Sequence, residues 1–332
     1  MDEIYILKTY KMKLFITVIL IFSCGFGINA QRRNKKEISI NCLQYQNPII
    51  NSYLADPFVM YEDGYYYFFA TGEAKDKRFI PIYRSKSMSS WEFVRGAVAK
   101  GGETDWNYAN FWAPEVIKID GKFYLYYTAK SISDPGNRVG VAIADSIQGP
   151  YKNIGVVVHN CSIDGHPVFD KDGSMYIYYT NEWNSAKGFY RGTIYMDKMI
   201  SPTQVADKPI PVITHHDWQE GAFLMQRNNQ YYLTYSCGNW SDSTYHLRYA
   251  LAKTITGPYI EQPDTILKSN KMVKGPGHHS IFLDQIGRDW LVYHGWDSAF
   301  TARYPRIDRL FVHGNKLSIN GPTYTPQKVK LK

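Results

Sequence analysis

The chain has few cysteines and no apolar segment long enough to span a membrane, and both features narrow the class of protein. Four of its 332 residues are cysteine. Cys42, Cys161 and Cys237 follow residue 30, and an odd number cannot pair completely, so disulfides are not the framework of the fold. No cysteine spacing typical of a metal site occurs. The apolar run at residues 14–22 is too short for a transmembrane helix, so we expect no membrane span.

Positive charge is concentrated at the two ends of the chain. The formal net charge is +8, of which residues 1–36 carry +5 and the last five residues carry +3, so residues 37–327 are neutral overall. A nucleic-acid-binding domain carries its positive charge as a patch or stripe on the folded surface. We therefore expect no nucleic-acid partner.

The first 30 residues have the pattern of an export signal. Three lysines precede the apolar run, and the mostly small or polar segment Ser23–Ala30 follows it. We expect residues 1–30 to be a signal peptide and residues 31–41 to be a flexible lead-in, which predicts a periplasmic or extracellular protein. Anchoring as a lipoprotein through Cys24 is an alternative that the bulky residue before Ser23 disfavours.

Aromatic residues are abundant, at 16% of the chain, and many occur in a repeated pattern. A turn such as Asp63-Gly64 opens five times onto alternating aromatic and β-branched residues. The second turn residue stands at positions 64, 121, 173, 229 and 287, so successive copies are 57, 52, 56 and 58 residues apart. Such turns predict β-hairpins, and their recurrence predicts a repeated β-unit. Five units of about four strands predict an all-β fold, a single five-bladed β-propeller over residues 42–332.

A short apolar strand precedes each turn, and polar residues stand near its start. In a propeller the inner strand of each blade runs along the central channel, so we expect these residues to meet at one mouth of it. They are Asp56, Glu115, Asp164, Glu220 and His278 or His279. Acidic groups gathered on an axis repel one another, which favours a functional reason for their presence. Such a group suits either hydrolysis by a general acid and a general base or cation binding by oxygen ligands.

The segments around these residues resemble the signature blocks of glycoside hydrolase family 43. The blocks are Ala55-Asp56-Pro57, Trp112-Ala113-Pro114-Glu115-Val116, Ile163-Asp164-Gly165-His166-Pro167, Glu220-Gly221-Ala222 and Gly275-Pro276-Gly277-His278-His279-Ser280. They occur in the family's order, and the resemblance covers about residues 47–322. It implies a five-bladed propeller that cleaves arabinosides or xylosides with inversion of configuration.

The resemblance also implies roles for the acidic residues. Asp56 is implied as the general base that activates water, and Glu220 as the general acid that protonates the leaving oxygen. Asp164 is implied as the third carboxylate, which tunes the acid and holds it in place. The base and acid of an inverting enzyme are expected about 6.5–9.5 Å apart, leaving room for water. Glu115 is the reserve candidate for the acid.

Three further residues are expected at the pocket. Trp112 is interpreted as a stacking platform for a sugar, with a core position as the alternative. Arg303 is expected to hold a substrate hydroxyl or to orient the base, with Arg306 and Arg309 as alternative registers. His278 is expected to bind substrate and to face a structural Ca²⁺ or other cation in the central channel, although no cofactor is required for the reaction.

We therefore expect an exported, inverting glycoside hydrolase that acts on arabinose- or xylose-containing plant glycans. An α-L-arabinofuranosidase is the first hypothesis. The alternatives are a β-xylosidase or an endo-arabinanase of the same family, or a propeller that binds glycans without cleaving them. The sequence does not decide between arabinose and xylose, or between exo and endo cleavage.

Overall fold

The computed structural model describes residues 42–183, 190–213 and 217–330, which fall within one compact unit of the chain, residues 40–332. The expected signal peptide (1–30) and lead-in (31–41) lie outside the described residues. Throughout the described ranges the regular structure is β, and no helix there has the length and apolarity to cross a membrane.

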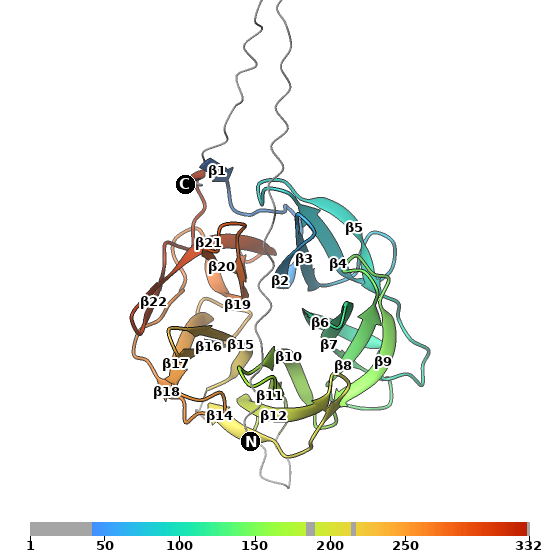
Figure 1. Ribbon diagram of the computed structural model, residues 1–332. Coiled ribbons are helices and arrows are strands. Elements are labelled where there is room, and N and C mark those ends of the chain that lie inside the picture. The colour runs from blue at the N-terminus through green and yellow to red at the C-terminus, as the bar shows by residue number, and fades with distance from the viewer. Residues whose placement is uncertain (1–41, 184–189, 214–216, 331–332) are drawn as a thin grey trace, which may run out of the picture. The chain divides into compact units, whose positions relative to one another are not determined.

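Five antiparallel sheets surround a central axis, and each is built from consecutive strands (Figure 1). Blade 1 contains β2 (Ala55–Glu62), β3 (Tyr65–Thr71), β4 (Phe79–Ser85) and β5 (Glu92–Val98). Blade 2 contains β6 (Ala109–Ile119), β7 (Lys122–Lys130), β8 (Arg138–Ala144) and β9 (Lys152–Val158). Blade 3 contains β10 (Ser162–Phe169), β11 (Met175–Asn181), β12 (Thr193–Ser201), β13 (Gln204–Val205) and β14 (Ile210–Ile213).

The last two blades have the same order of strands. Blade 4 contains β15 (Gln219–Arg227), β16 (Gln230–Cys237), β17 (His246–Ala252) and β18 (Ile260–Glu261). Blade 5 contains β19 (Lys274–Leu283), β20 (Asp289–Trp296), β21 (Arg303–His313) and β22 (Lys316–Ile319). The five-bladed propeller expected from the repeated turns is therefore confirmed.

The repeated turns connect the first and second strands of every blade, as expected. Asp63 and Gly64 have φ values of 47° and 83°, and Asp120 and Gly121 have 48° and 79°. Two consecutive positive φ values are the signature of the tight hairpin turn, and glycine adopts them without steric cost. The turns thus fix the pairing of the two innermost strands of each blade.

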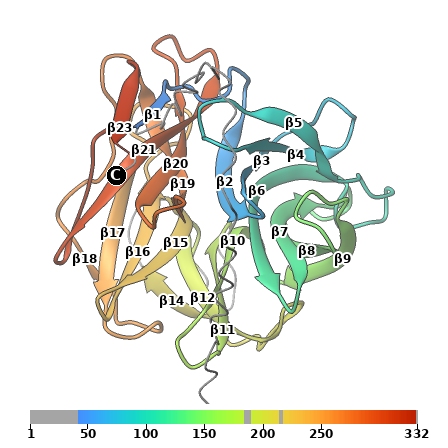
Figure 2. The ribbon, with the colours of Figure 1, turned by 45° about the horizontal axis from the view of Figure 1, so that its top comes forward.

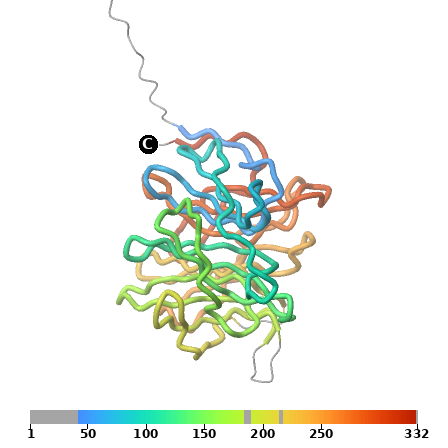
Figure 3. Tube along the Cα trace, turned by 90° about the vertical axis from the view of Figure 1, so that its right-hand side faces the viewer, coloured from blue at the N-terminus to red at the C-terminus, as the bar shows by residue number. Residues whose placement is uncertain are grey.

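The ends of the described chain meet at a small separate sheet. β1 (Cys42–Tyr45) pairs antiparallel with β23 (Gln327–Lys330), and Figure 2 shows the two strands side by side. Nearby, the Asn47 side chain donates to the Ile307 carbonyl and accepts from its N–H, each at 2.9 Å. In the side view the blue first blade and the red last blade lie next to each other (Figure 3). The ring closes without exchange of strands between blades.

The apolar core is divided into five clusters, and each fills the interface between two neighbouring blades. Hairpin tyrosines supply much of it and also cross the interfaces with their hydroxyls. Tyr126 donates to the carbonyl of Pro202 at 2.5 Å, and Tyr178 donates to that of Ile255 at 2.7 Å. Burying such a side chain contributes about 1.5–3 kcal/mol. The repeated aromatic pattern is therefore scaffold that packs blade against blade.

Each inner strand carries a bulge near its start, where one residue adopts a left-handed backbone. β6 and β19 carry a second such residue upstream, at Asn110 and Gly275. The φ values are 50° at Asp56, 47° at Ala113, 61° at Asp164, 58° at Gly221 and 39° at His278. Left-handed backbone is uncommon for residues other than glycine, so surrounding contacts must hold it.

In all five blades those contacts come from the preceding blade, whose side chain accepts the N–H of the left-handed residue. In blade order the acceptors are His294 Nδ1 (3.1 Å), Thr71 Oγ1 (2.9 Å), Thr128 Oγ1 (3.0 Å), Asp164 Oδ2 (3.2 Å) and Ser236 Oγ (2.8 Å). This ring of hydrogen bonds fixes the inner strands to one another where they reach the mouth of the channel.

Candidate active site

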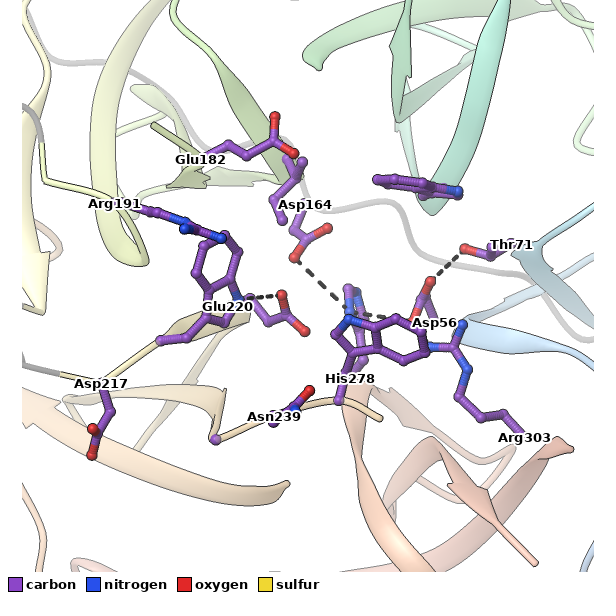
Figure 4. Close-up of a pocket in the computed structure, with 15 residues that line it drawn as sticks. Asp56, Thr71, Asp164, Glu182, Arg191, Asp217, Glu220, Asn239, His278 and Arg303 are labelled. Atoms are coloured by element: carbon purple, nitrogen blue, oxygen red, sulfur yellow. Dashed lines mark hydrogen bonds and ion pairs between the residues drawn. The ribbon is translucent and has the colours of Figure 1, made fainter. Parts of the chain in front are cut away.

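A cavity of about 680 Å³ lies where the five bulges meet. Its volume falls in the range of roughly 300–1,000 Å³ that is usual for ligand sites. Six residues expected from the sequence line it, as Figure 4 shows in part: Asp56, Trp112, Asp164, Glu220, His278 and Arg303. Asp56 comes from blade 1, Asp164 from blade 3 and Glu220 from blade 4, so three carboxylates face one space from different blades.

Asp56 is surrounded by groups that stabilise its negative charge. Thr71 Oγ1 donates to Asp56 Oδ2 at 2.5 Å, and the guanidinium of Arg303 lies 3.7 Å from Oδ1. The Nδ1 atom of His278 lies 3.4 Å from the same oxygen. Burial alone would raise the pKa of Asp56, but the charges of His278 and Arg303 hold it well below its usual range. Asp56 is therefore ionised at neutral pH, as a general base must be.

Asp164 has the opposite electrostatic character. It is buried, and burial together with the negative charges of Glu220 and Asp56 raises its pKa to about 8 against the opposing effect of His278. Its ligand atoms and those of Glu220 and His278 lie within 4.8 Å of one another. Asp164 therefore keeps a proton at neutral pH, next to the Glu220 carboxyl group.

Glu220 is held at both of its carboxylate oxygens. The Trp218 indole donates to Oε2 at 2.5 Å, and the hydroxyl of buried Tyr245 donates to Oε1 at 2.6 Å. The next residue, Gly221, donates its N–H to Asp164, so the strand that carries Glu220 is tied to the neighbouring carboxylate. A Cβ at Gly221 would lie 3.3 Å from the His278 ring at a φ of 58°, which explains the glycine there.

His278 lies between the base and the carboxylate pair. Its Nδ1 is 3.4 Å from Asp56 Oδ1 and 3.9 Å from Asp164 Oδ2 (Figure 4). Burial would lower the pKa of His278, but the nearby carboxylates, with Asp56 first, raise it above its ordinary value. The raised pKa favours the imidazolium form, which places positive charge at the centre of the cavity.

Arg306 and Arg309, the two alternative arginines, lie outside the cavity lining. Arg306 is buried and donates to the Thr323 carbonyl, and Arg309 packs against Trp290 and Phe311. Arg303 is therefore the arginine of this segment that reaches the pocket.

Glu115 was expected among the converging acids, and that expectation is wrong for the pocket. Its Oε2 accepts from His166 Nδ1 at 2.6 Å, while His166 Nε2 accepts from the Leu224 N–H. Glu115 stands two residues after the left-handed Ala113, so the bulge directs it away from the position that Asp56 occupies. His279 likewise bonds Thr234 rather than lining the cavity.

Several residues that contact the carboxylates were not expected from the sequence. Thr71 and His294 stand near the ends of second strands, at the positions that also hold Thr128 and Ser236. Aligning the ends of the five hairpin strands, as well as their starts, would have indicated them. Tyr245 and Trp218 precede strands of blade 4 and carry no repeated signal.

The expected cation ligand also belongs to this carboxylate group. Among the described residues, Asp164, Glu220 and His278 form a set that could hold a metal ion. Three donors fall short of the six to eight oxygen ligands that Ca²⁺ takes, so water would have to supply the rest. A cation bound there would also displace the proton held by Asp164.

Comparison with known proteins accords with this geometry. A family model described as glycosyl hydrolases family 43 matches residues 45–314. The extracellular endo-α-(1→5)-L-arabinanase 1 of Bacillus subtilis (strain 168) is 29% identical over 299 residues, covering 82% of this chain and 88% of that protein. The extracellular exo-α-(1→5)-L-arabinofuranosidase of Cellvibrio japonicus (strain Ueda107) is 26% identical over 286 residues, covering 74% of this chain and 79% of that protein.

A solved structure gives the same result. The crystal structure of a thermostable family-43 glycoside hydrolase superposes with a TM-score of 0.75 and 30% identity, covering 85% of this chain and 98% of that one. The family model spans most of the chain, including all five inner strands and the three carboxylates that they carry. The resemblance seen in the sequence is thus confirmed, and the chain belongs to glycoside hydrolase family 43.

Proposed function

We propose that this protein is an exported α-L-arabinofuranoside-cleaving hydrolase that works with inversion of configuration on pentose-containing plant glycans. The observation that carries the proposal is the division of charge among its carboxylates. Asp56 is held ionised by His278 and Arg303, while buried Asp164, next to Glu220, retains a proton. One ionised and one protonated carboxyl group on facing blades are the base and acid that inverting hydrolysis needs.

The proposed reaction proceeds in one displacement. The Asp56 carboxylate takes a proton from a water molecule, and the water oxygen bonds to the anomeric carbon of the sugar. The bond between that carbon and the glycosidic oxygen breaks on the opposite face. Glu220 gives its proton to the departing oxygen, and Asp164 holds the Glu220 strand through the Gly221 N–H. The products are a free sugar of inverted configuration and a shortened glycan.

The remaining pocket residues are proposed to hold the sugar. Arg303 lies close to Asp56 and is proposed to bind a hydroxyl of the sugar while it orients the base. Trp112, half-buried in the cavity wall, is proposed as the stacking surface for the sugar ring. His278 contributes positive charge and a donor at the centre of the cavity. The reaction as proposed requires no metal ion, so treatment with a chelator should leave kcat/KM unchanged.

The second candidate is endo cleavage of arabinan, which is favoured by the name of the Bacillus subtilis relative. β-Xylosidase activity and glycan binding without cleavage are the third and fourth. Product analysis on 4-nitrophenyl α-L-arabinofuranoside, the matching β-D-xyloside and linear arabinan separates the four functions. Release of arabinose monomers supports the first candidate, oligomers support the second, and no product from any of the three substrates overturns the hydrolase proposal.

Substitution of the acid tests the assignment of roles. Glu220→Gln should abolish cleavage of substrates with poor leaving groups, because glutamine has no proton to give. Glu115→Gln is the matched control, since Glu115 is bonded to His166 outside the cavity lining. Full activity in the first variant together with loss in the second would reverse the assignment. Proton NMR of the first-formed sugar anomer tests inversion.

We also propose that the protein is exported, and two observations support this. The N-terminal pattern of lysines, apolar residues and small residues is that of an export signal. The two relatives described above carry the word extracellular in their names. N-terminal sequencing of the protein recovered outside the cytoplasm should begin near residue 31. Recovery only in the cytoplasm, with residue 1 intact, contradicts export.

A further inference from the structure

Exposed aromatic rings extend outward from the rim of the cavity. Trp240 lines the cavity and is 45% exposed, and its ring stacks on that of Trp296 with centroids 6.3 Å apart and planes at 18°. Trp296 in turn meets Phe300 at 6.0 Å and half-exposed Tyr53 edge-on at 6.2 Å. We call Tyr53, Trp240, Trp296 and Phe300 the rim cluster. It is assembled from three parts of the chain that are distant in sequence.

Hydrogen bonds hold the rim cluster in place. The Trp296 indole N–H donates to the Trp240 carbonyl at 2.8 Å. Asp297 closes the turn that carries Phe300, because it accepts from the N–H groups of Ala299 at 3.2 Å and Thr301 at 2.8 Å. The turn therefore presents Phe300 in a fixed position.

The conformation of Phe300 is unusual for an exposed apolar residue. Its φ is 57°, a value that bulky residues rarely adopt, and its ring is 38% exposed. Backbone strain at an exposed ring gives no burial in return, which points to a role in binding. Single exposed apolar residues elsewhere are normal, but a contiguous patch that continues into a cavity marks a ligand-binding surface.

Arg303 joins the rim cluster to the reacting groups. Its guanidinium lies 4.5 Å from the ring centroid of Trp240, 5.5 Å from that of Tyr53 and 5.7 Å from that of Trp296. The same group is 3.7 Å from Asp56 Oδ1, and its Nε donates to the Tyr53 hydroxyl at 3.0 Å. The rim cluster is thus continuous with the base side of the cavity.

We propose that the rim cluster binds further pentose units of the glycan chain whose linkage is cleaved in the cavity. The proposal rests on the proposed hydrolase function and narrows its substrate to chains of several units. Aromatic faces suit the C–H faces of sugar rings, while the nearby guanidinium and the Tyr53 hydroxyl suit sugar hydroxyls.

Phe300→Ala tests this subsite, because Phe300 contacts the rim cluster but not the cavity lining. In the wild-type protein kcat/KM should rise with the length of unbranched pentose oligosaccharides. In the variant, the ratio of kcat/KM on a long oligosaccharide to that on the 4-nitrophenyl pentoside should fall about 2- to 13-fold, the worth of one aromatic contact. Phe169→Ala is the matched control, because Phe169 is 43% exposed at the far end of β10 from Asp164.

Phe300→Leu separates ring stacking from general apolar contact. It keeps most of the side-chain volume but has no ring face, so the ratio should fall in this variant as well. The subsite proposal is overturned if both variants keep the wild-type ratio of kcat/KM on the oligosaccharide to that on the aryl pentoside. It is also overturned if kcat/KM falls by the same factor on both substrates. Dimerisation of the wild-type protein that is lost in Phe300→Ala, measured by sedimentation, would make the rim cluster a contact between copies and also overturn the proposal.

A binding measurement separates failure of the subsite from failure of the function. The full chain carrying Glu220→Gln is titrated calorimetrically with a pentose oligosaccharide, with and without Phe300→Ala. Weaker binding with Phe300→Ala, by the same 2- to 13-fold, supports the subsite whatever the enzyme assays show. If the wild type cleaves aryl pentosides but Phe300→Ala leaves the binding affinity in the titration unchanged, the subsite is refuted and the hydrolase proposal stays intact.

Discussion

Replacing Asp164 by asparagine tests the electrostatic basis of the proposed mechanism. Asparagine keeps the shape of the side chain and an oxygen that can accept the Gly221 N–H, which now reaches Asp164 Oδ2 at 3.2 Å. It removes the negative charge and the titratable proton. The variant therefore changes the electrostatics of the carboxylate pair while the strand that carries Glu220 stays in place.

The size of the effect follows from the separation of the two carboxylates. Ligand atoms of Asp164 and Glu220 lie within 4.8 Å of each other. Two unit charges at this distance repel by about 3.5 kcal/mol at an effective dielectric constant of about 20. That energy is equivalent to about two and a half pH units in the pKa of Asp164. Without the repulsion the last proton leaves the site more easily, so the basic limb of the kcat/KM profile should move toward acid by up to this amount.

The assay is the pH dependence of kcat/KM on an unactivated oligosaccharide, whose leaving oxygen needs a proton. The 4-nitrophenyl glycoside serves as the comparison, because its leaving group departs with little help from an acid and its basic limb should move less. Asp197→Asn is the matched control, since Asp197 is buried in the same blade, away from the cavity lining, and burial also raises its pKa. A basic limb that stays in place, or that moves toward higher pH, refutes the reasoning.

Three further predictions follow from contacts at the site. Tyr245→Phe removes the 2.6 Å hydrogen bond to Glu220 and should lower kcat/KM on oligosaccharides about 10- to 150-fold, the equivalent of about 1.5–3 kcal/mol. Tyr235→Phe is the control and should not lower it, because the Tyr235 hydroxyl donates to Glu261, a carboxylate elsewhere. Arg303→Gln removes a cation beside Asp56 and should raise the pKa of that base, so the acidic limb of the kcat/KM profile should move to higher pH. An acidic limb that moves to lower pH contradicts this assignment. Between pH 3.8, the ordinary pKa of an aspartate, and about pH 8, folded Asp164 keeps a proton that the unfolded chain has lost. As the pH rises through this range, the free energy of unfolding should therefore fall by up to about 1.4 kcal/mol per pH unit through this group. Thermal unfolding of Asp164→Asn should lack that fall, and parallel curves for variant and wild type would contradict it.

The fold was predictable because its repeated signal is local. Turns such as Asp63-Gly64 fix the register of a hairpin without help from the rest of the chain. Their spacing then gives the number of blades. The small sheet of β1 and β23 was not predicted, since it joins segments from opposite ends of the chain and carries no turn signal between them.

The site was predictable in its membership but not in its register. The residues expected to line the pocket do so because the inner strands all start at the same mouth of the channel. However, Asp56 and Asp164 occupy the left-handed position of their bulges, Glu220 stands one residue before it, and Glu115 stands two residues after it. The place of a bulge depends on a hydrogen bond from the preceding blade, which a single strand's sequence does not contain.

The rim cluster was not predicted for a different reason. Tyr53 precedes blade 1, Trp240 follows a strand of blade 4, and Phe300 lies in a turn of blade 5. None of these positions belongs to the repeat, so aligning the five copies gives no reason to group them. Trp240 meets the turn of Phe300 because blades 4 and 5 are adjacent, and Tyr53 joins them because the ring closes and brings the first blade against the last.

The fourth bulge shows how the scaffold and the proposed chemistry share one residue. At the other four bulges the acceptor from the preceding blade is a hydroxyl or an imidazole, as with Thr128 and His294. At the fourth, Thr180 stands in the hydroxyl position but donates to the Gln219 carbonyl, and Asp164 accepts the Gly221 N–H instead. The carboxylate that holds the acid's strand is therefore the same one that shares the acid's proton. Any movement of this strand changes the separation of the two carboxylates, so the position of Glu220 and the protonation of the pair are set together.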